Sequence, residues 1–402
     1  MNNELYENEK VDLFQEPTGN EIKLTNEQIN EKYKKGEVRI ITEQARYPLN
    51  TIVNMVNSED YILNPEFQRR HRWDGTRKSK LIESFIMNVP IPPIFLYERE
   101  YSVYEVMDGL QRLTAISQFY EDRFSLQDLV EWKELNGLKY SQLPEQIRKG
   151  IDRRYISSII LLQETAKSES EANRLKQLVF ERINSGGEKL KAQEIRNALF
   201  PGGLNDLTIS LSRNKYFCKL WNIPEPDETE LTTGQPRQEV IEDKNFKDMS
   251  DAELVLRFFA YRQIDQWQGN TMEYFLDEFL KKGNEQFNDN VLTNLKDLFN
   301  DTVKFAYELF DEKAFWLHRN RENKWFHYER PTKILYDPFM QVLANNLDKK
   351  SKILTKKSHI NDGLEGFHKS QYDYFKGRDT NKTKVIERIN VLNEYLNSFI
   401  NA

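Results

Sequence analysis

The sequence predicts an α+β domain over residues 37–203, followed by an all-helical domain over residues 204–402. In the first part, short β-branched and apolar runs alternate with amphipathic helical patterns, and after Pro201 the periodicity is almost wholly helical. A length of 402 residues also favours two domains over one. Residues 1–36 are polar and weakly patterned, so we expect them to form an N-terminal extension.

The first domain should contain a small mixed sheet with helices. Asp74 is a suitable N-cap for a helix that ends at the following prolines, and those prolines lead into a hairpin. In chain order the expected elements are a strand at 38–45, a short helix within 47–60, a strand from 61, a helix at 76–88, strands at 94–98 and 103–107 joined by a turn at 99–102, a helix from 110 through 119, a strand at 155–164, and helices at 170–183 and 191–200.

The second domain shows apolar residues at helical spacing over most of its length. Helices are expected at 204–214, 252–263, 272–282, 290–310 and 384–400. The acidic, proline-containing stretch at 223–243 lacks an apolar period, and we expect it to be a mobile loop.

The composition excludes several classes of protein. A net charge of -6 argues against a protein that coats nucleic acid by bulk electrostatics, although local basic patches stay possible. The single cysteine, Cys218, rules out an intramolecular disulfide framework and a cysteine-based zinc site. The N-terminus lacks the pattern of a secretory signal, and no apolar run approaches membrane-spanning length. We therefore expect a cytoplasmic protein without membrane contact.

The first candidate site is the stretch YEVMDGLQRLTAIS at 104–117, where a strand turns directly into a helix. A helix N-terminus offers unpaired amides to an anion, and Gly109 lets the backbone approach closely. Arg112 could contact a phosphate, Asp108 could bind a metal or orient a water, and Gln111 could position the same water. In the alternative interpretation, Asp108 only caps the helix and Arg112 pairs with an acid.

Two further polar segments accompany this junction. The loop NPEFQRRHRWD at 64–74 carries Gln68 and Arg69 among several donors, which suits phosphate recognition, although a solvated basic loop is equally consistent. The segment FERINSGGEKLKAQEIRNALF at 180–200 has small residues and free amides at Asn184-Ser185-Gly186-Gly187, with Glu194 and Arg196 in the helix that follows. Its alternative interpretation is a sharp helix–helix turn.

Together these motifs resemble the N-terminal domain family of GmrSD-type restriction enzymes, a branch of the ParB/sulfiredoxin-like fold. The matching pieces are Gln68-Arg69 with Trp73, LIESFIMNVPIPPIFLYE, DGLQRLTAI and FERINSGGEKLKAQEIRNALF, with weaker similarity in ELVLRFF and FKGRDTNKTKVIERI. The resemblance implies nucleotide binding and hydrolysis in support of DNA restriction, with an NTP substrate and Mg²⁺. One position departs from the family signature, because Leu110 stands where the family has its first glutamine.

The resemblance and the three segments together nominate a set of site residues. They are Asp108, Gln111 and Arg112 for catalysis; Gln68, Arg69, Gly109, Leu110, Arg112, Asn184, Gly186 and Gly187 for nucleotide binding; Glu194 and Arg196 as outer neighbours of the site; and Asp108 as the magnesium ligand.

GmrSD-type enzymes pair this domain with an HNH-type nuclease, whose metal site needs several clustered histidines. His318, His327, His359 and His368 lack that spacing, so we expect them to be isolated residues and any nuclease to be a separate subunit. The basic stretches at 349–357 and 375–384 could meet DNA or be solvated. The aromatic and basic stretch at 315–330 could stack on bases, although helix packing is the simpler expectation.

Three functions follow from these observations. The first is an NTP-binding and NTP-hydrolysing regulator of a restriction or phage-defence system. The second is a metal-dependent DNA nuclease that uses the same residues. The third is a non-catalytic adaptor that binds DNA or a partner protein, which the replacement by Leu110 and the acidic net charge favour.

Overall fold

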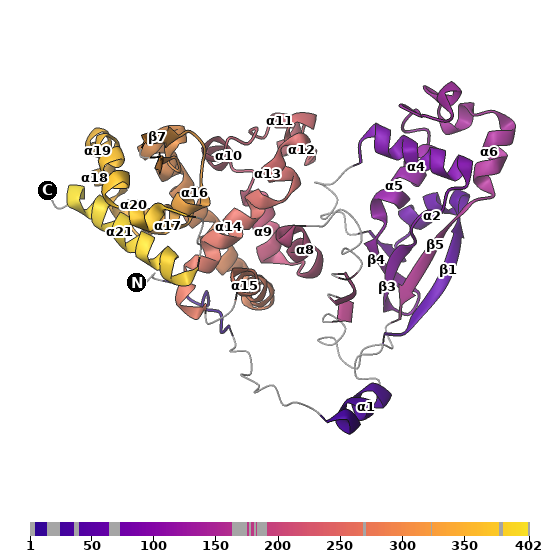
Figure 1. Cartoon of the computed structure of the whole chain (residues 1–402), viewed down its shortest axis with the longest axis horizontal. Coiled ribbons are helices and arrows are strands. Elements are labelled where there is room, and N and C mark those ends of the chain that lie inside the picture. The colour runs from indigo at the N-terminus through magenta and orange to yellow at the C-terminus, as the bar shows by residue number, and fades with distance from the viewer. Residues whose placement is uncertain are drawn as a thin grey trace. The chain divides into compact units, whose positions relative to one another are not determined.

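The computed structural model describes residues 5–13, 25–35, 40–63, 73–162, 175–176, 178–180, 182, 191–267, 271–322, 324–377 and 381–400. The chain divides into two compact units, one of residues 19–190 and one of residues 1–18 with 191–402 (Figure 1). Helix α8 (Ala192–Leu199) packs on helices of the second unit, so this division falls before the boundary expected at residue 203.

The unit of residues 19–190 is built on a mixed sheet with the strand order β1-β5-β3-β4-β2 in its described part. Neighbours β1 and β5 are antiparallel, as are β3 and β4, whereas β3 lies parallel to β5 and β2 parallel to β4. The strands are β1 (Thr42–Pro48), β2 (Tyr61–Ile62), β3 (Ile94–Glu100), β4 (Val103–Asp108) and β5 (Tyr155–Leu161). A mixed sheet with helices confirms the predicted α+β class.

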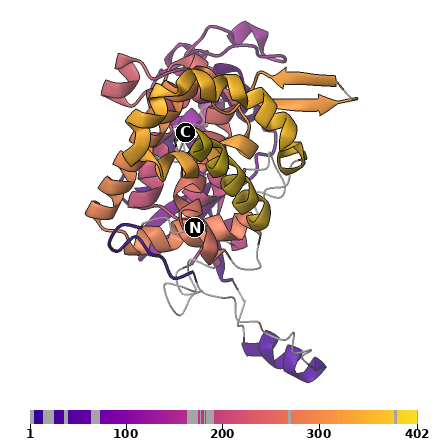
Figure 2. The same ribbon diagram turned by 90° about the vertical axis from the view of Figure 1, so that its left-hand side faces the viewer.

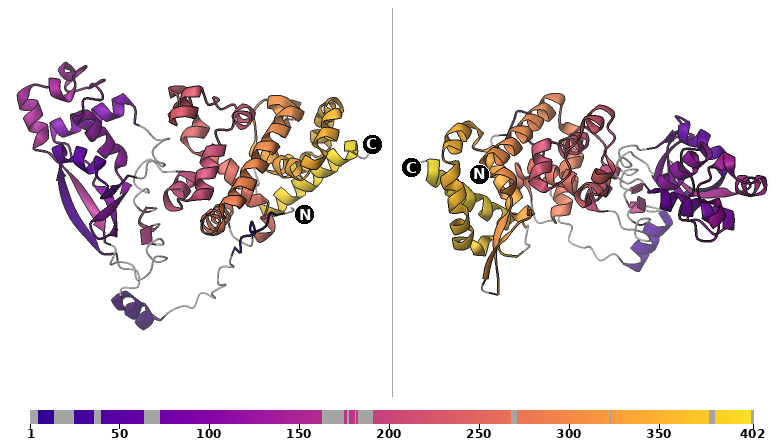
Figure 3. Two further views of the ribbon diagram at one scale, coloured as in Figure 1. Left: turned by 180° about the vertical axis from the view of Figure 1, so that it is seen from behind. Right: turned by 90° about the horizontal axis from the view of Figure 1, so that it is seen from above.

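Helices of this unit pack on the sheet around one apolar core (Figure 3, left). Ile94 and Leu96 alternate along β3 toward Leu113 and Ile116 of α5, which is the period expected for a strand with one buried face. The helices are η1 (Leu49–Thr51), α2 (Ile52–Asn57), α4 (Gly75–Met87), α5 (Leu110–Tyr120), η2 (Lys133–Leu135), η3 (Tyr140–Gln142) and α6 (Glu145–Asp152), preceded in the chain by the polar helix α1 (Asn26–Lys35).

Local signals in the sequence place α4 and the hairpin that follows it. The carboxylate of Asp74 accepts a hydrogen bond from the backbone N–H of Arg77 at 2.7 Å, which confirms the predicted N-cap. Asn88 closes the helix in the left-handed conformation, at φ 59°. Strands β3 and β4 form the predicted hairpin, but they reach closer to its tip, so only Tyr101 and Ser102 remain in the turn.

The second unit is largely helical. Its central helix is α14, in which ten of twelve residues are buried. The helices are α8, α9 (Gly203–Leu211), α10 (Lys215–Trp221), α11 (Glu228–Thr233), α12 (Gln238–Glu242), α13 (Lys244–Lys247), α14 (Ser250–Tyr261), η6 (Ile264–Gln266), α15 (Met272–Gln286), α16 (Asp289–Phe310), η7 (Asp311–Lys313), α17 (Lys333–Ala344), η8 (Leu347–Lys349), α18 (Lys350–Thr355), α19 (Lys357–Ser370), α20 (Tyr372–Phe375) and α21 (Lys382–Ile400). None of the helices described is long and apolar enough to cross a bilayer.

Two expectations for this unit are wrong in detail. The stretch expected as a loop at 223–243 contains α11 and α12, because Asp227 caps α11 and Arg213 binds Glu230 at 2.5 Å. Because polar side chains make these contacts, the sequence shows no apolar periodicity over this stretch. The aromatic and basic stretch at 315–330 is not helical but forms an antiparallel hairpin of β6 (Leu317–Arg321) and β7 (Lys324–Tyr328).

The N-terminal residues 5–13 pack against the helical unit instead of forming a loose arm. The Glu9 carboxylate accepts hydrogen bonds from Arg262 Nε at 2.5 Å and Nη2 at 2.7 Å. Gln263 completes the contact, since its side chain accepts from the Val11 backbone N–H at 2.9 Å and donates to the Glu9 carbonyl at 2.7 Å. Glu9 and Val11 are both buried, so this segment belongs to the core of the helical unit.

Candidate functional site

The junction of β4 and α5 depends on the backbone conformation of Gly109. This residue is the N-cap of α5 at φ 96°, in the region that favours glycine. A Cβ atom here would lie 2.4 Å from Cγ2 of Ile94, so a side chain would also clash with the neighbouring strand. No side chain caps α5 in the described structure. The strand therefore turns into the helix at once and leaves first-turn amides without a side-chain acceptor.

Asp108 and Arg112 form an ion pair at this junction. Arg112 Nη2 donates to Asp108 Oδ2 at 2.6 Å, and Arg112 Nη1 donates to the carbonyl of Pro92 at 2.6 Å. The Arg112 side chain is only 11 % exposed, whereas that of Asp108 is 38 % exposed. The structure thus shows the pairing of Arg112 with an acid, and the half-exposed carboxylate is the group of this pair that meets solvent.

Gln111 ties the arginine-rich segment to the same junction. Its side-chain oxygen accepts a hydrogen bond from the backbone N–H of Trp73 at 3.0 Å. At the other end of that segment, Ile62 of β2 pairs with Glu105 of β4. The described residues on either side of 64–72 therefore lie beside β4 and α5. Gln68 and Arg69 themselves lie outside the described residues.

Leu110, the departure from the family signature, is a core residue. Its side chain is buried in the apolar cluster of the sheet unit, together with Leu113 and Ile94. An amide at this position would be buried among apolar side chains, at a cost unless it found a partner. Leucine is therefore suited to this buried position, and residue 110 contributes only its backbone groups to the junction.

The third nominated segment divides between described and undescribed residues. Asn184, Gly186 and Gly187 lie outside the described part of the chain. Glu194 accepts from the Lys191 backbone N–H at 2.6 Å, which caps the start of α8. Arg196 is buried and donates to Asp277 at 2.6 Å and to Glu253 at 3.3 Å. These contacts give both side chains a structural role within the helical unit.

Three residues outside the set nominated for the site shape it. Pro92 supplies the carbonyl that holds Arg112, and Trp73 supplies the N–H that holds Gln111. Lys176 forms an ion pair of 2.5 Å with Glu105 of β4, with both side chains largely buried. The proline run before β3 was visible in the sequence, but Lys176 carried no signal because its partner is 71 residues away.

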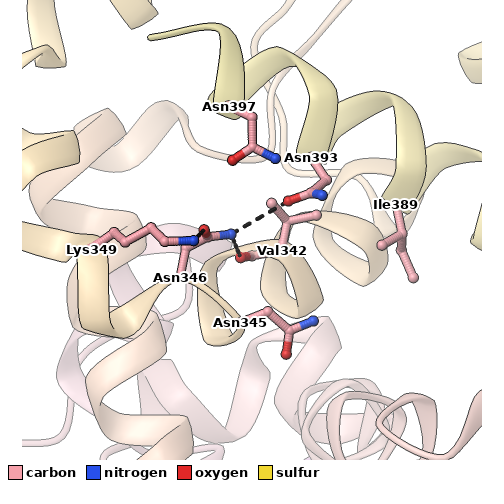
Figure 4. Close-up of a pocket in the computed structure, with 7 residues that line it drawn as sticks. All are labelled: Val342, Asn345, Asn346, Lys349, Ile389, Asn393 and Asn397. Atoms are coloured by element: carbon pink, nitrogen blue, oxygen red, sulfur yellow. Dashed lines mark hydrogen bonds between the residues drawn. The ribbon is translucent and has the colours of Figure 1, made fainter. Parts of the chain in front are cut away.

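The helical unit contains a polar hollow of about 210 Å³ between the end of α17, η8 and α21. The side chains of Asn393 and Asn397 on α21 approach Asn346 and Lys349 there (Figure 4). It is lined by Val342, Asn345, Asn346, Lys349, Ile389, Asn393 and Asn397. None of the residues nominated from the sequence lines this hollow.

Three of the four C-terminal histidines are clustered, although they were expected to be isolated. The rings of His318 and His327 stack with centroids 4.3 Å apart, and Nδ1 of His318 lies 3.2 Å from Nδ1 of His368. They meet because β6 and β7 pair and β6 packs on α19, which sequence spacing does not reveal. No group of three or more His, Cys, Asp or Glu among the described residues could hold a metal ion.

Burial sets the protonation of this cluster. Desolvation lowers the pKa of His368 to about 3, with a further contribution from His318 and His327, and it also lowers the pKa of His318 and of His327. A histidine in an unfolded chain has a pKa of about 6.5. The folded state therefore favours the neutral rings over the charged ones. Their contribution to the free energy of unfolding is fully present above pH 6.5.

We expect the free energy of unfolding to fall as the pH is lowered from 6.5 toward 3. At pH 5, His368 alone should account for a loss of about 2 kcal/mol, because the unfolded chain takes up the proton and the folded chain does not. Denaturant unfolding at several pH values should show a flatter profile for His368→Phe than for the wild type. His359→Phe, at an exposed histidine, is the control, and an equal flattening there would contradict this origin.

Comparison with known proteins assigns part of the chain to a family. Residues 49–201 match the model of the GmrSD restriction endonuclease N-terminal domain. No curated protein and no solved structure matches the chain. The matched residues include strands β2 to β5, the β4–α5 junction and helix α8. This part of the chain, which contains the β4–α5 junction, is thus similar to the N-terminal domain of GmrSD restriction endonucleases.

Proposed function

We propose that the chain binds an NTP at the β4–α5 junction and hydrolyses it in support of DNA restriction. The observation that carries this proposal is the start of α5, where Gly109 turns the chain directly into a helix N-terminus that no described side chain caps. The first-turn amides and the helix dipole together stabilise an anion at such a place. A triphosphate is the anion that the family assignment favours.

Asp108 is the reactive carboxylate in this proposal. Its Oδ2 accepts from Arg112, while its Oδ1 has no hydrogen-bond partner among the described residues and can orient a water molecule. Arg112 is held by Asp108 and by the Pro92 carbonyl, so it acts as a positioning residue that fixes the carboxylate. Arg69, which lies outside the described residues, would supply the positive charge toward the phosphates.

A single carboxylate suits Mg²⁺, which usually keeps waters and phosphate oxygens as its remaining ligands. Asp108 would hold the ion through its exposed oxygen. Bound Mg²⁺ would neutralise charge on the phosphates.

The test is nucleotide binding and phosphate release by the full chain with Mg²⁺ and each of the four NTPs. Asp108→Asn retains an oxygen for Arg112 but removes the negative charge. We expect it to lower the rate of phosphate release by about 10²–10⁴, the usual contribution of a positioned acid–base group, while nucleotide binding is largely kept. Calorimetry measures the binding, and a phosphate assay measures the turnover.

Glu134→Gln is the matched control, because it removes an exposed carboxylate from the same unit and should leave the turnover unchanged. Failure of the wild type to bind any NTP would sink the proposal. Adding plasmid DNA to the same mixture tests whether the chain is itself a nuclease. DNA cleavage that requires metal but no NTP, and that Asp108→Asn abolishes, would identify a nuclease instead.

A further inference from the structure

The β6–β7 hairpin has two different faces. Strand pairing sets Arg319 opposite Phe326 and Arg321 opposite Lys324, while His318 and Asn320 lie opposite His327 and Trp325. Because side chains alternate across a strand, Arg319, Arg321, Lys324, Phe326 and Tyr328 share one face. We call these five residues the basic hairpin face.

The opposite face of the hairpin is covered by its own unit. His318 contacts His368 of α19, and the ring of Trp325 packs on Tyr372 of α20 with centroids 5.2 Å apart. Tyr372 also donates to the carbonyl of Asn320 at 3.2 Å. These contacts fix the hairpin on α19 and α20, so the basic hairpin face is presented on a supported element. Figures 2 and 3 show the hairpin, in orange, standing out from the helices of its unit.

The outer part of the basic hairpin face is exposed, since Arg321, Lys324 and Phe326 are exposed, whereas Nε of Arg319 is buried and Leu317, on the same side of the hairpin, lies in the apolar core. No hydrogen bond or ion pair joins its side chains to another element among the described residues, and Arg321 has only the adjacent Glu322, at 3.6 Å with both side chains highly exposed. Such an exposed ion pair contributes little to stability. Phe326 is 41 % exposed, which is unusual for a phenylalanine that has a core nearby.

The chemistry of this face matches an unpaired nucleic-acid strand. Three cations and no acid lie on it, in a chain whose net charge is -6. The Arg319 guanidinium lies 4.8 Å from the centroid of the Tyr328 ring, and the Phe326 ring lies exposed beside them. Proteins that hold single strands combine such cations for the phosphates with aromatic rings on which bases stack.

Of the two other basic stretches of this unit, 375–384 is only partly described, and 349–357 is a weaker candidate. In residues 349–357, Lys350 binds Glu308 at 2.6 Å and Lys357 binds Asp311 at 2.9 Å, so acids already pair with part of its charge. It also contains no aromatic residue. We propose that the basic hairpin face binds an unpaired stretch of DNA through phosphate contacts of Arg321 and Lys324 and base stacking on Phe326. This proposal does not depend on the nucleotide site.

The test is fluorescence anisotropy of the full chain, without nucleotide, with a labelled single-stranded oligonucleotide of mixed sequence and with the same sequence as a duplex. We expect the single strand to bind more tightly and the affinity to fall with salt. Arg321→Ala with Lys324→Ala should weaken the affinity about tenfold at moderate salt and reduce the salt slope by about 1.4, since each phosphate contact on a single strand contributes about 0.7. Phe326→Ala should weaken the affinity at least about fivefold.

The matched control is Lys296→Ala with Lys304→Ala, which also removes two positive charges, but from an exposed face of α16. It should leave the affinity unchanged, and thermal unfolding should show that every variant is folded. Absence of binding to either oligonucleotide would overturn the proposal, as would an equal loss in the control pair. Tighter binding of the duplex with no effect of Phe326→Ala would also overturn it, because bases in a duplex are not available for stacking.

Discussion

Asp337→Ala should lower the free energy of unfolding by about 3–5 kcal/mol, the cost of leaving one member of a buried ion pair without its partner. Arg257 of α14 and Asp337 of α17 are both buried, and they form a two-pronged pair in which Nε lies 2.9 Å from Oδ1 and Nη2 contacts Oδ2. Burial lowers the pKa of Arg257, but the charge and hydrogen bonds of Asp337, together with Tyr261 and Glu253, outweigh burial and raise it. Without Asp337, the nearest acid described is Glu253, at 4.0 Å.

Chemical denaturation of the full chain measures this loss. Asp348→Ala is the control, since it removes an exposed aspartate from the same unit and should change the stability by no more than about 0.5 kcal/mol. The double variant Arg257→Leu with Asp337→Leu should be more stable than Asp337→Ala, because apolar residues at both positions leave no unpaired charge. A loss below about 1 kcal/mol for Asp337→Ala would show that Arg257 finds another partner.

Glu9→Ala should destabilise the helical unit by about 3 kcal/mol, the lower end of the cost of breaking a buried pair, because the terminal segment can move aside and admit water to Arg262. The Glu9 carboxylate holds Arg262 through two hydrogen bonds. Loss of this pair should also release the Val11 amide from Gln263. Denaturation measures the stability, and hydrogen exchange at Val11 measures the release.

Glu7→Ala serves as the control for Glu9→Ala, because Glu7 is an exposed glutamate of the same segment. It should leave both the stability and the exchange at Val11 unchanged. If Glu9→Ala accelerates exchange without lowering the stability, then the segment docks but contributes little to the fold.

Local signals explain which elements could be predicted from the sequence. Asp74 and the prolines after α4 fix that helix and the following strand through contacts within a few residues. The β4–α5 junction was equally visible, because a glycine between a strand and a helix has few structural uses. The pair of Asp108 and Arg112 spans one helical turn, so it was foreseeable as one of two interpretations.

Contacts between distant residues explain what could not be predicted. Glu9 and Arg262 carry no local pattern, and each histidine of the cluster comes from a different element. The hairpin was missed because both of its faces carry polar and aromatic residues, which does not resemble a strand with one apolar face. Leu110 was recognised as a departure from the family signature, but its place in the core required the fold.

The order of residues in the chain has a consequence for the newly synthesised protein. Glu9 leaves the ribosome before its partner Arg262, which follows 253 positions later. At a synthesis rate of about 5–20 residues per second, the segment that contains Glu9 waits roughly 13 to 50 s before it can dock. All of residues 19–190 are translated within that interval. The unit of residues 19–190 can therefore fold while the helical unit still lacks the residues that bind its segment 5–13.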